Sequence, residues 1–141
     1  MTDRPAVLVT GGAQRIGAAF SRAFAAAGWH VVIHYRSSGA EAAALAEELP
    51  SAETIQADLA EDGAPDALVR GLADRLQDWR CLVNSAAVFK PDDVTGLDPA
   101  TFDTAMSVNT RAPAMLAQSY LAHARAPLGR RVIQVTDQKL A

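Results

Sequence analysis

The stretch Ala6-Val-Leu-Val-Thr-Gly-Gly-Ala-Gln-Arg-Ile-Gly17 decides the fold of this chain. Residues 6–10 form a short apolar run with β-branched side chains, which is typical of a buried strand. Two glycines end the run, and apolar residues from Ile16 to Ala27 then recur at helical spacing, which predicts a helix with one apolar face. A glycine-rich turn before a helix N-terminus presents backbone N–H groups and partial positive charge, so this stretch predicts a phosphate-binding turn.

The rest of the chain alternates between strand and helix patterns. Apolar runs with β-branched residues predict further strands at 29–35, 53–57, 81–84 and 131–136. Helical spacing predicts helices at 40–49, 64–79 and 99–124. Proline cannot donate a backbone hydrogen bond, so we expect the last helix to bend near Asn109 or Pro113. Strands that alternate with helices form parallel sheets covered on both faces, which predicts one α/β domain over residues 1–141.

The composition is that of a globular chain without a basic surplus. Half of the 141 residues are hydrophobic and the net charge is −3, which excludes a disordered chain and argues against nucleic-acid binding. The single cysteine, Cys81, lies in an apolar run and is expected to be a buried residue in a reducing compartment. No apolar stretch reaches the roughly 20 residues of a membrane span and no leader peptide is visible, so we expect a cytoplasmic protein without a membrane partner.

The first turn, Thr10-Gly-x-x-x-Arg15-x-Gly17, resembles the Thr-Gly-x-x-x-Gly-x-Gly fingerprint of the short-chain dehydrogenase/reductase family. Arg15 stands where the family has its middle glycine, and this form is similar to the pteridine reductase and dihydromonapterin/dihydrofolate reductase branch. The resemblance implies a Rossmann-type doubly wound parallel sheet with strand order 3-2-1-4-5, truncated after strand five. It implies cofactor contacts from Thr10, Gly11, Gly12, Gln14, Arg15, Ile16 and Gly17.

The resemblance also places Arg15 over the cofactor pyrophosphate and near the substrate. The alternative is a solvated arginine in the first helical turn. A cation beside a helix N-terminus is disfavoured unless an anion lies there too, which favours the functional interpretation.

The end of the second strand favours NADP(H) over NAD. The sequence His34-Tyr35-Arg36-Ser37-Ser38 contains no acidic residue before Glu41. A carboxylate there would repel a 2′-phosphate, whereas an arginine and serine hydroxyls bind one. The resemblance places this segment at the adenosine ribose and gives cofactor contacts to His34, Tyr35, Arg36 and Ser37; the alternative is an ordinary polar loop.

Two further segments resemble cofactor-binding motifs of the family. Asp58 and Leu59 follow the third strand, where the family's Asp meets the adenine amino group; Asp58 is also a candidate helix N-cap. Asn84-Ser85-Ala86-Ala87 partly matches the Asn-Asn-Ala-Gly motif that runs along the cofactor, so contacts are expected from Asn84, Ser85 and Ala86. An ordinary turn at the end of a strand is the alternative.

Three residues resemble parts of the reaction site. Phe89 matches a phenylalanine that stacks on the flat pterin ring, although core packing is the alternative. Asn109 matches the asparagine that supports the family's catalytic lysine through a water, although tertiary packing could also explain it. Asp137 matches an aspartate that helps deliver a proton to the pterin, and the alternative is a turn residue. The resemblance therefore implies catalytic roles for Asp137 and Asn109, and substrate contacts for Arg15, Phe89 and Asp137.

The family's Tyr-x-x-x-Lys motif is absent from these residues. The chain has only Tyr35 and Tyr120, and neither has a lysine four residues later. We therefore expect an NADPH-dependent reductase of a dihydropterin or dihydrofolate, of which this chain is an incomplete part without activity of its own. The alternatives are a general ketone or 3-oxoacyl reductase, a non-catalytic NADP-binding module, or an interaction protein that keeps the fold.

The resemblance also has implications for assembly. Members of the family are usually tetramers whose long helices pair, so we expect a homo-oligomer formed through the Pro99–Ala124 helix. The expected ligands are NADP(H) and a small-molecule substrate, and no metal ligands are predicted.

Overall fold

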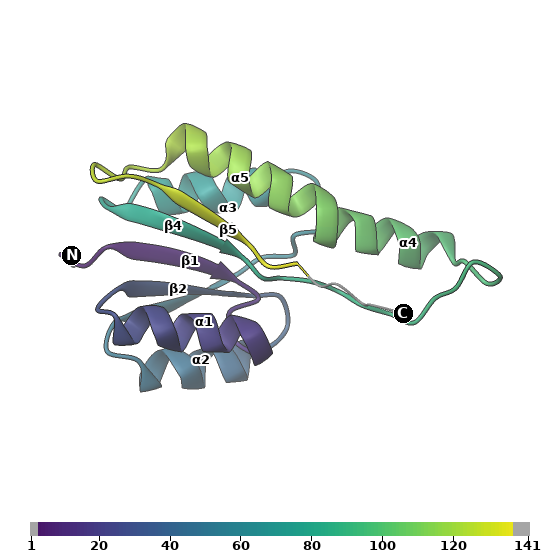
Figure 1. Ribbon diagram of the computed structural model, residues 1–141, viewed down its shortest axis with the longest axis horizontal. Helices are drawn as coiled ribbons and strands as arrows, with labels where there is room; N and C mark the ends of the chain where they lie inside the picture. The colour runs from purple at the N-terminus through teal and green to yellow at the C-terminus, as the bar shows by residue number, and fades with distance from the viewer. Residues whose placement is uncertain (1–2, 137–141) are drawn as a thin grey trace.

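The computed structural model describes residues 3–136, which form a five-stranded parallel sheet (Figure 1). The strand order is β3-β2-β1-β4-β5, and each neighbouring pair is parallel. The strands are β1 (Ala6–Thr10), β2 (His30–Tyr35), β3 (Ala52–Gln56), β4 (Trp79–Asn84) and β5 (Arg131–Gln134). The doubly wound sheet and its predicted order 3-2-1-4-5 are confirmed.

The helices cover both faces of the sheet (Figure 1). Helices α1 and α2 lie on one face, and α3, α4 and α5 lie on the other. They are α1 (Arg15–Ala26), α2 (Gly39–Glu48), α3 (Ala64–Ala73), α4 (Pro99–Met106) and α5 (Ala112–His123). A π-helical turn, η1 (Ser107–Arg111), joins α4 to α5.

The central strand β1 supplies both halves of the core. All five of its residues are buried, and successive side chains point to opposite faces. Val7 and Val9 join the cluster under α1 and α2, whereas Ala6 and Leu8 join the cluster under α3 and α5. A strand buried on both faces needs a continuous apolar run, which is why residues 6–9 carry no polar side chain.

The buried face of α1 differs from the predicted one. Ile16 is 59% exposed, while the buried positions are Gly17, Ala18, Ser21 and Ala25. Small side chains let the helix lie close against the sheet, so its contact face is marked by size and not by hydrophobicity. The apolar spacing counted from Ile16 therefore matches the buried face only in part: Phe20 and Phe24 pack against the core, whereas Ile16, Ala19, Ala23 and Ala27 are exposed.

The third helix ends earlier than predicted. It stops at Ala73, and Trp79 begins β4 instead of ending the helix. Leu72, Leu76 and Trp79 keep helical spacing across the boundary, which explains the error. Trp79 is fully buried against Tyr120 in an edge-to-face contact, and the Tyr120 hydroxyl donates a 2.9 Å hydrogen bond to the Trp79 carbonyl.

The long helix is interrupted near Asn109 and Pro113, as predicted, and the interruption takes the form of the π-helical turn η1. Pro113 has no N–H to donate to the carbonyl of Asn109, four residues earlier. A π-helical turn at this place accommodates the missing bond, and such turns are frequent at functional sites. The remaining boundaries differ from the predicted ones by one or two residues.

Burial also accounts for Cys81. The residue is 2% exposed, and burial raises the pKa of its thiol to about 11. It is a small core residue, as predicted, and not a reactive thiolate. Within residues 3–136 no helix has both the length and the apolarity that a membrane crossing requires.

A cluster of ionic hydrogen bonds joins the start of β3 to β2 and to the segment after α3. Glu53 accepts hydrogen bonds from His30 (2.7 Å to Nε2) and Arg75 (2.9 Å to Nη1). Burial alone would raise the pKa of Glu53, but these two partners outweigh it and lower the pKa to about 2. A carboxyl group whose folded pKa is depressed stabilises the fold above its unfolded pKa, and this stabilisation is lost as the pH falls toward the folded value.

We therefore predict that Glu53→Gln lowers the free energy of unfolding at pH 7 by about 2 kcal/mol, and that the difference from wild type vanishes between pH 4.5 and 2. Urea denaturation at several pH values measures this. Glu48→Gln is the matched control, because Glu48 pairs with Arg22 at the exposed surface and should change stability little. A difference for Glu53→Gln that persists at pH 2 would contradict the assignment.

Candidate cofactor site

The predicted cofactor residues gather where β1 to β4 end. Carboxyl ends of parallel strands meet at one edge of the sheet, and ligands of such folds bind outside that edge. Four segments follow these strand ends: residues 11–17, 35–38, 57–63 and 85–88. The fold therefore brings together segments that lie far apart in the sequence.

The turn after β1 leaves no room for side chains. Gly11 has φ of +58°, and a Cβ atom there would lie 2.9 Å from the Cα of Ala86. A Cβ atom on Gly17 would lie 1.9 Å from the Gly11 carbonyl oxygen. The first turn of α1 thus lies directly on the loop, which only glycine at both positions permits.

The N-terminus of α1 is uncapped. Gln14 occupies the N-cap position without a side-chain hydrogen bond, and the first turn contains no acidic residue. The first intrahelical bond runs from the Ala18 N–H to the Gln14 carbonyl. The N–H groups of residues 15–17 therefore have no partner within the helix, and an anion is the natural ligand for them.

Arg15 is held in a strained backbone conformation. Its φ is +53°, and it is the one non-glycine residue with positive φ among residues 3–136. The left-handed region costs an ordinary residue about 1–2 kcal/mol. Arg15 is exposed, so packing within the chain does not offset this cost. Strain of this kind concentrates at functional sites, and here it lies in the first turn of the uncapped helix.

Thr10 binds the neighbouring strand end instead of facing the crevice. Its side chain is buried, and its Oγ1 accepts hydrogen bonds of 3.0 Å from the N–H groups of Ser85 and Ala86. Asn84 is also buried; its Nδ2 lies 3.4 Å from the Pro113 carbonyl, and its Oδ1 has no hydrogen-bond partner among residues 3–136. Thr10 therefore fixes the backbone after β4, whereas Asn84 contacts α5.

His34 is likewise an interior residue. It is 2% exposed, and its ring lies between the turn after β1 and the end of β3. The Gly11 N–H donates to Nδ1 (3.0 Å), and Nε2 lies 2.9 Å from the Ala57 carbonyl oxygen. Burial lowers the pKa of the ring more than the bond to Ala57 raises it. Any influence of this side chain on a ligand passes through the backbone.

Arg36 and Asp58 meet at the ribose side of the crevice. Arg36 is exposed, and its Nε lies 3.8 Å from Asp58 Oδ2. Asp58 Oδ1 accepts a hydrogen bond from the Ala60 N–H, so Asp58 closes a turn, and Gly63 is the N-cap of α3. The interpretation of Asp58 as a helix N-cap is therefore wrong. The exposed Ser37 follows Arg36, so a cation and a hydroxyl, which are groups that bind phosphate, stand next to each other after β2.

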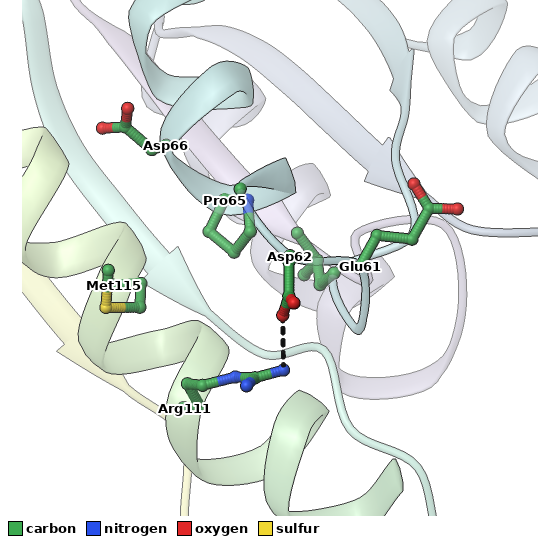
Figure 2. Close-up of a pocket in the computed structure, with 8 residues that line it drawn as sticks. Glu61, Asp62, Pro65, Asp66, Arg111 and Met115 are labelled. Atoms are coloured by element: carbon green, nitrogen blue, oxygen red, sulfur yellow. Dashed lines mark ion pairs between the residues drawn. The ribbon is translucent and has the colours of Figure 1, made fainter.

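The loop after β3 is tied to the π-helical turn. Arg111 Nη2 lies 3.4 Å from Asp62 Oδ1, 3.5 Å from the Ala60 carbonyl oxygen and 3.2 Å from Ser107 Oγ. Figure 2 shows this ion pair beside a small pocket between the loop, α3 and the helical turn. The side chain of Leu59 is buried, which leaves only its backbone to face a ligand. Arg111 was not predicted, because its contacts join segments about 50 residues apart.

The residues predicted to face the substrate follow β4. Phe89 is 83% exposed and does not pack in the core formed by the described residues. The Asn109 side chain makes two hydrogen bonds to the backbone of Val88. Its Oδ1 accepts a hydrogen bond from the Val88 N–H, and its Nδ2 donates one to the Val88 carbonyl oxygen, both at 2.8 Å. This pair of bonds fixes the chain just before Phe89. Asp137 lies outside the described residues.

The predicted residues thus fall into two groups. Some present backbone or exposed side chains at the crevice: Gly11, Gln14, Arg15, Ile16, Gly17, Arg36, Ser37 and the half-buried Tyr35, Ser85 and Ala86. Others hold the crevice from within: Thr10, Gly12, His34, Leu59 and Asn84. Among residues 3–136 no group of three or more His, Cys, Asp or Glu side chains could hold a metal ion.

Known proteins share both the sequence pattern and the fold. The structure of FolM alternative dihydrofolate reductase 1 from Brucella canis, complexed with NADP, superposes with a TM-score of 0.85 and 35% identity over 94% of this chain and 55% of that one. Galactitol 2-dehydrogenase of Agrobacterium fabrum is 29% identical over 93% of this chain and 52% of its own length. Pteridine reductase 1 of Leishmania tarentolae is 37% identical over 62% of this chain and 38% of its own length.

The chain spans about half the length of the curated relatives it matches. The sequence model of the short chain dehydrogenase family matches residues 5–138, which is nearly all of the chain. That match and the geometry of the turn after β1 lead to one conclusion: this chain belongs to the short-chain dehydrogenase family.

Proposed function

We propose that this chain is the NADP-binding part of an NADPH-dependent oxidoreductase. The uncapped N-terminus of α1 carries the proposal, because it combines free amides, tight glycines and a strained arginine in one turn. The NADP-bound structure from Brucella canis supports the same cofactor for a relative with 35% identity. The exposed Arg36, with no acid after β2, supports NADP over NAD.

Each part of the crevice then has a role in binding. The amides of residues 15–17 and the Arg15 guanidinium hold the pyrophosphate, and Arg36 with Ser37 holds the 2′-phosphate. Asp58 accepts a hydrogen bond from the adenine amino group, and the small residues Ser85 and Ala86 let the nicotinamide ribose approach β4. The bound cofactor supplies a hydride from C4 of its nicotinamide ring. The chain supplies position, since these contacts fix the direction in which the ring points.

For the substrate we propose a dihydropterin or dihydrofolate. Phe89 is free to stack on a flat heterocycle because its ring is exposed and its loop is anchored by Asn109. Arg15 lies on the path from the pyrophosphate to the substrate, and Asp137 is proposed to deliver a proton. The Brucella and Leishmania relatives carry dihydrofolate and pteridine reductase names, which supports this choice. The second candidate is a general carbonyl reductase, favoured by the galactitol dehydrogenase relative.

We further propose a homo-oligomer formed through α4 and α5, in the cytoplasm. Phe102, Met106, Met115 and Leu121 are each between 42% and 51% exposed on these helices. Several exposed apolar side chains on one pair of helices are typical of a surface that another chain covers.

Arg36 should decide the preference for a 2′-phosphate. We predict that wild type binds 2′,5′-ADP about 10- to 100-fold more tightly than 5′-AMP, because a charge-assisted hydrogen bond is worth roughly 1.5–3 kcal/mol. Arg36→Ala should remove most of this preference, measured by calorimetric titration with both ligands. Arg22→Ala is the control, since Arg22 lies on α1 and pairs with Glu48. Equal binding of both ligands by wild type would refute the NADP assignment.

The backbone strain at Arg15 should lower the stability of the fold, while the Arg15 side chain should strengthen cofactor binding. Glycine accepts φ of +53° without strain whereas alanine does not, so Arg15→Gly should be about 1 kcal/mol more stable than Arg15→Ala. Both variants should bind NADP⁺ more weakly than wild type, because both lose the guanidinium. Urea denaturation gives the stabilities and calorimetry gives the affinities. Unchanged affinity in both variants would show that Arg15 does not contact the pyrophosphate.

The 141-residue chain should bind the cofactor without turning it over. Neither tyrosine has a lysine four residues later, so the motif that clamps and protonates in the family is absent from these residues. We predict constant NADPH absorbance when the chain is mixed with dihydropterins or simple ketones. Measurable NADPH oxidation by the purified chain would contradict the prediction, provided that it is absent from a sample carrying Gly17→Ala, whose Cβ would collide with the Gly11 carbonyl.

A further inference from the structure

His34 stands at the one place from which a side chain can reach both the phosphate turn and the adenosine loop. It lies near the end of β2, and β2 has β1 on one side and β3 on the other. The ring is almost completely buried and reaches across both strand ends. Its two nitrogens, on opposite sides of the ring, therefore meet different segments of the crevice.

The two hydrogen bonds require one form of the ring. The Gly11 N–H is a donor, so Nδ1 must accept and carries no proton. The Ala57 carbonyl oxygen is an acceptor, so Nε2 must donate and carries the proton. Burial lowers the pKa of the ring, which agrees with a neutral imidazole. Geometry alone therefore defines the tautomer as the one protonated on Nε2.

Residue 34 also controls the second amide of the turn. The Gly12 N–H donates to the His34 carbonyl oxygen (3.0 Å), while the Gly11 N–H donates to the ring. Both amides that open the phosphate turn are thus held by one residue of the neighbouring strand. On the other side, Thr10 ties the same strand end to Ser85 and Ala86. The amides in the first turn of α1 have no partner within the helix and are available to a ligand.

We propose that His34 is a positioning residue for the cofactor: its neutral ring sets the spacing between the phosphate turn at Gly11 and the adenosine loop at Ala57, without touching the ligand. This inference rests on the proposed cofactor function and deepens it. The pyrophosphate lies against the segment that begins at Gly11, and the adenine lies against the segment that begins at Asp58. Because the ring joins both backbones, it sets the distance between the segment that binds the pyrophosphate and the segment that binds the adenine.

Two substitutions each remove one of the two hydrogen bonds made by the His34 ring. In His34→Asn the amide oxygen replaces Nδ1 as acceptor for Gly11, and the bond to Ala57 is lost. In His34→Gln the amide nitrogen replaces Nε2 as donor to Ala57, and the acceptor for Gly11 is lost. His30→Asn is the matched control, because His30 is also on β2 with both ring nitrogens engaged, by Ser51 and Glu53, at the opposite end of the strand.

The measurement is the dissociation constant of 2′,5′-ADP for the four proteins, with urea denaturation in parallel. We expect His34→Gln and His34→Asn each to bind about tenfold more weakly, since each loses one of the two buried hydrogen bonds that join the segments, and one such bond is worth about that factor. His30→Asn should bind normally even where it loses as much stability. A merely structural role would change affinity only in step with stability. Binding as tight as wild type by either His34 variant would overturn the proposal.

The wild-type protein gives a second test that needs no variant. Nitrogen-15 NMR of the imidazole should show the proton on Nε2 and a bare Nδ1 at neutral pH, and the Gly11 amide should exchange slowly with solvent. A proton on Nδ1, or rapid exchange of the Gly11 amide, would overturn the proposal even if a variant failed to fold. Absence of 2′,5′-ADP binding by a wild type with the expected tautomer would instead refute the cofactor function, so the two failures are distinguishable.

Discussion

The close contact between Gly17 and the Gly11 carbonyl is the constraint on which the site depends. A Cβ atom at residue 17 would lie 1.9 Å from that oxygen, so helix α1 can begin where it does only over a bare backbone. This contact points the uncapped N-terminus of α1 at the sheet edge. Thr10 ties the end of β1 to the backbone after β4, and His34 holds the turn after β1 from the neighbouring strand β2. The crevice is therefore built from backbone and kept in place by buried side chains.

Charge distinguishes the two ends of the crevice. Arg15 stands at the helix N-terminus and Arg36 at the end of β2, although the chain as a whole carries a net charge of −3. Local cations in an acidic chain favour a ligand with phosphates at two places over a general affinity for polyanions. Arg15 is exposed, and the loose 3.8 Å contact between Arg36 and Asp58 leaves the Arg36 guanidinium free to move onto such a ligand.

Sequence patterns predicted most elements, because alternating runs of period two and period 3.6 are strong signals, whereas the sheet order was implied by the resemblance to the family. Two predictions from these patterns were wrong. Helix α1 is buried through the small residues Ala18 and Ser21 and not through Ile16. Trp79 keeps the spacing of the preceding helix but belongs to strand β4. At the site, the phosphate turn and Arg36 were found from motifs. Sequence patterns did not predict that His34 and Thr10 act from the interior, or that Asn109 binds the backbone of Val88. These hydrogen bonds join residues 21 to 76 positions apart.

Backbone amide NMR of the chain during titration with NADP⁺ tests the central claim most directly. If the turn after β1 holds the pyrophosphate, the largest shifts will be at the amides of residues 13–17, with further shifts at 36–37, 58–59 and 85–86. Shifts confined to the outer face of α4 and α5 or to the pocket beside Arg111, or no shifts with saturating NADP⁺, would contradict the account.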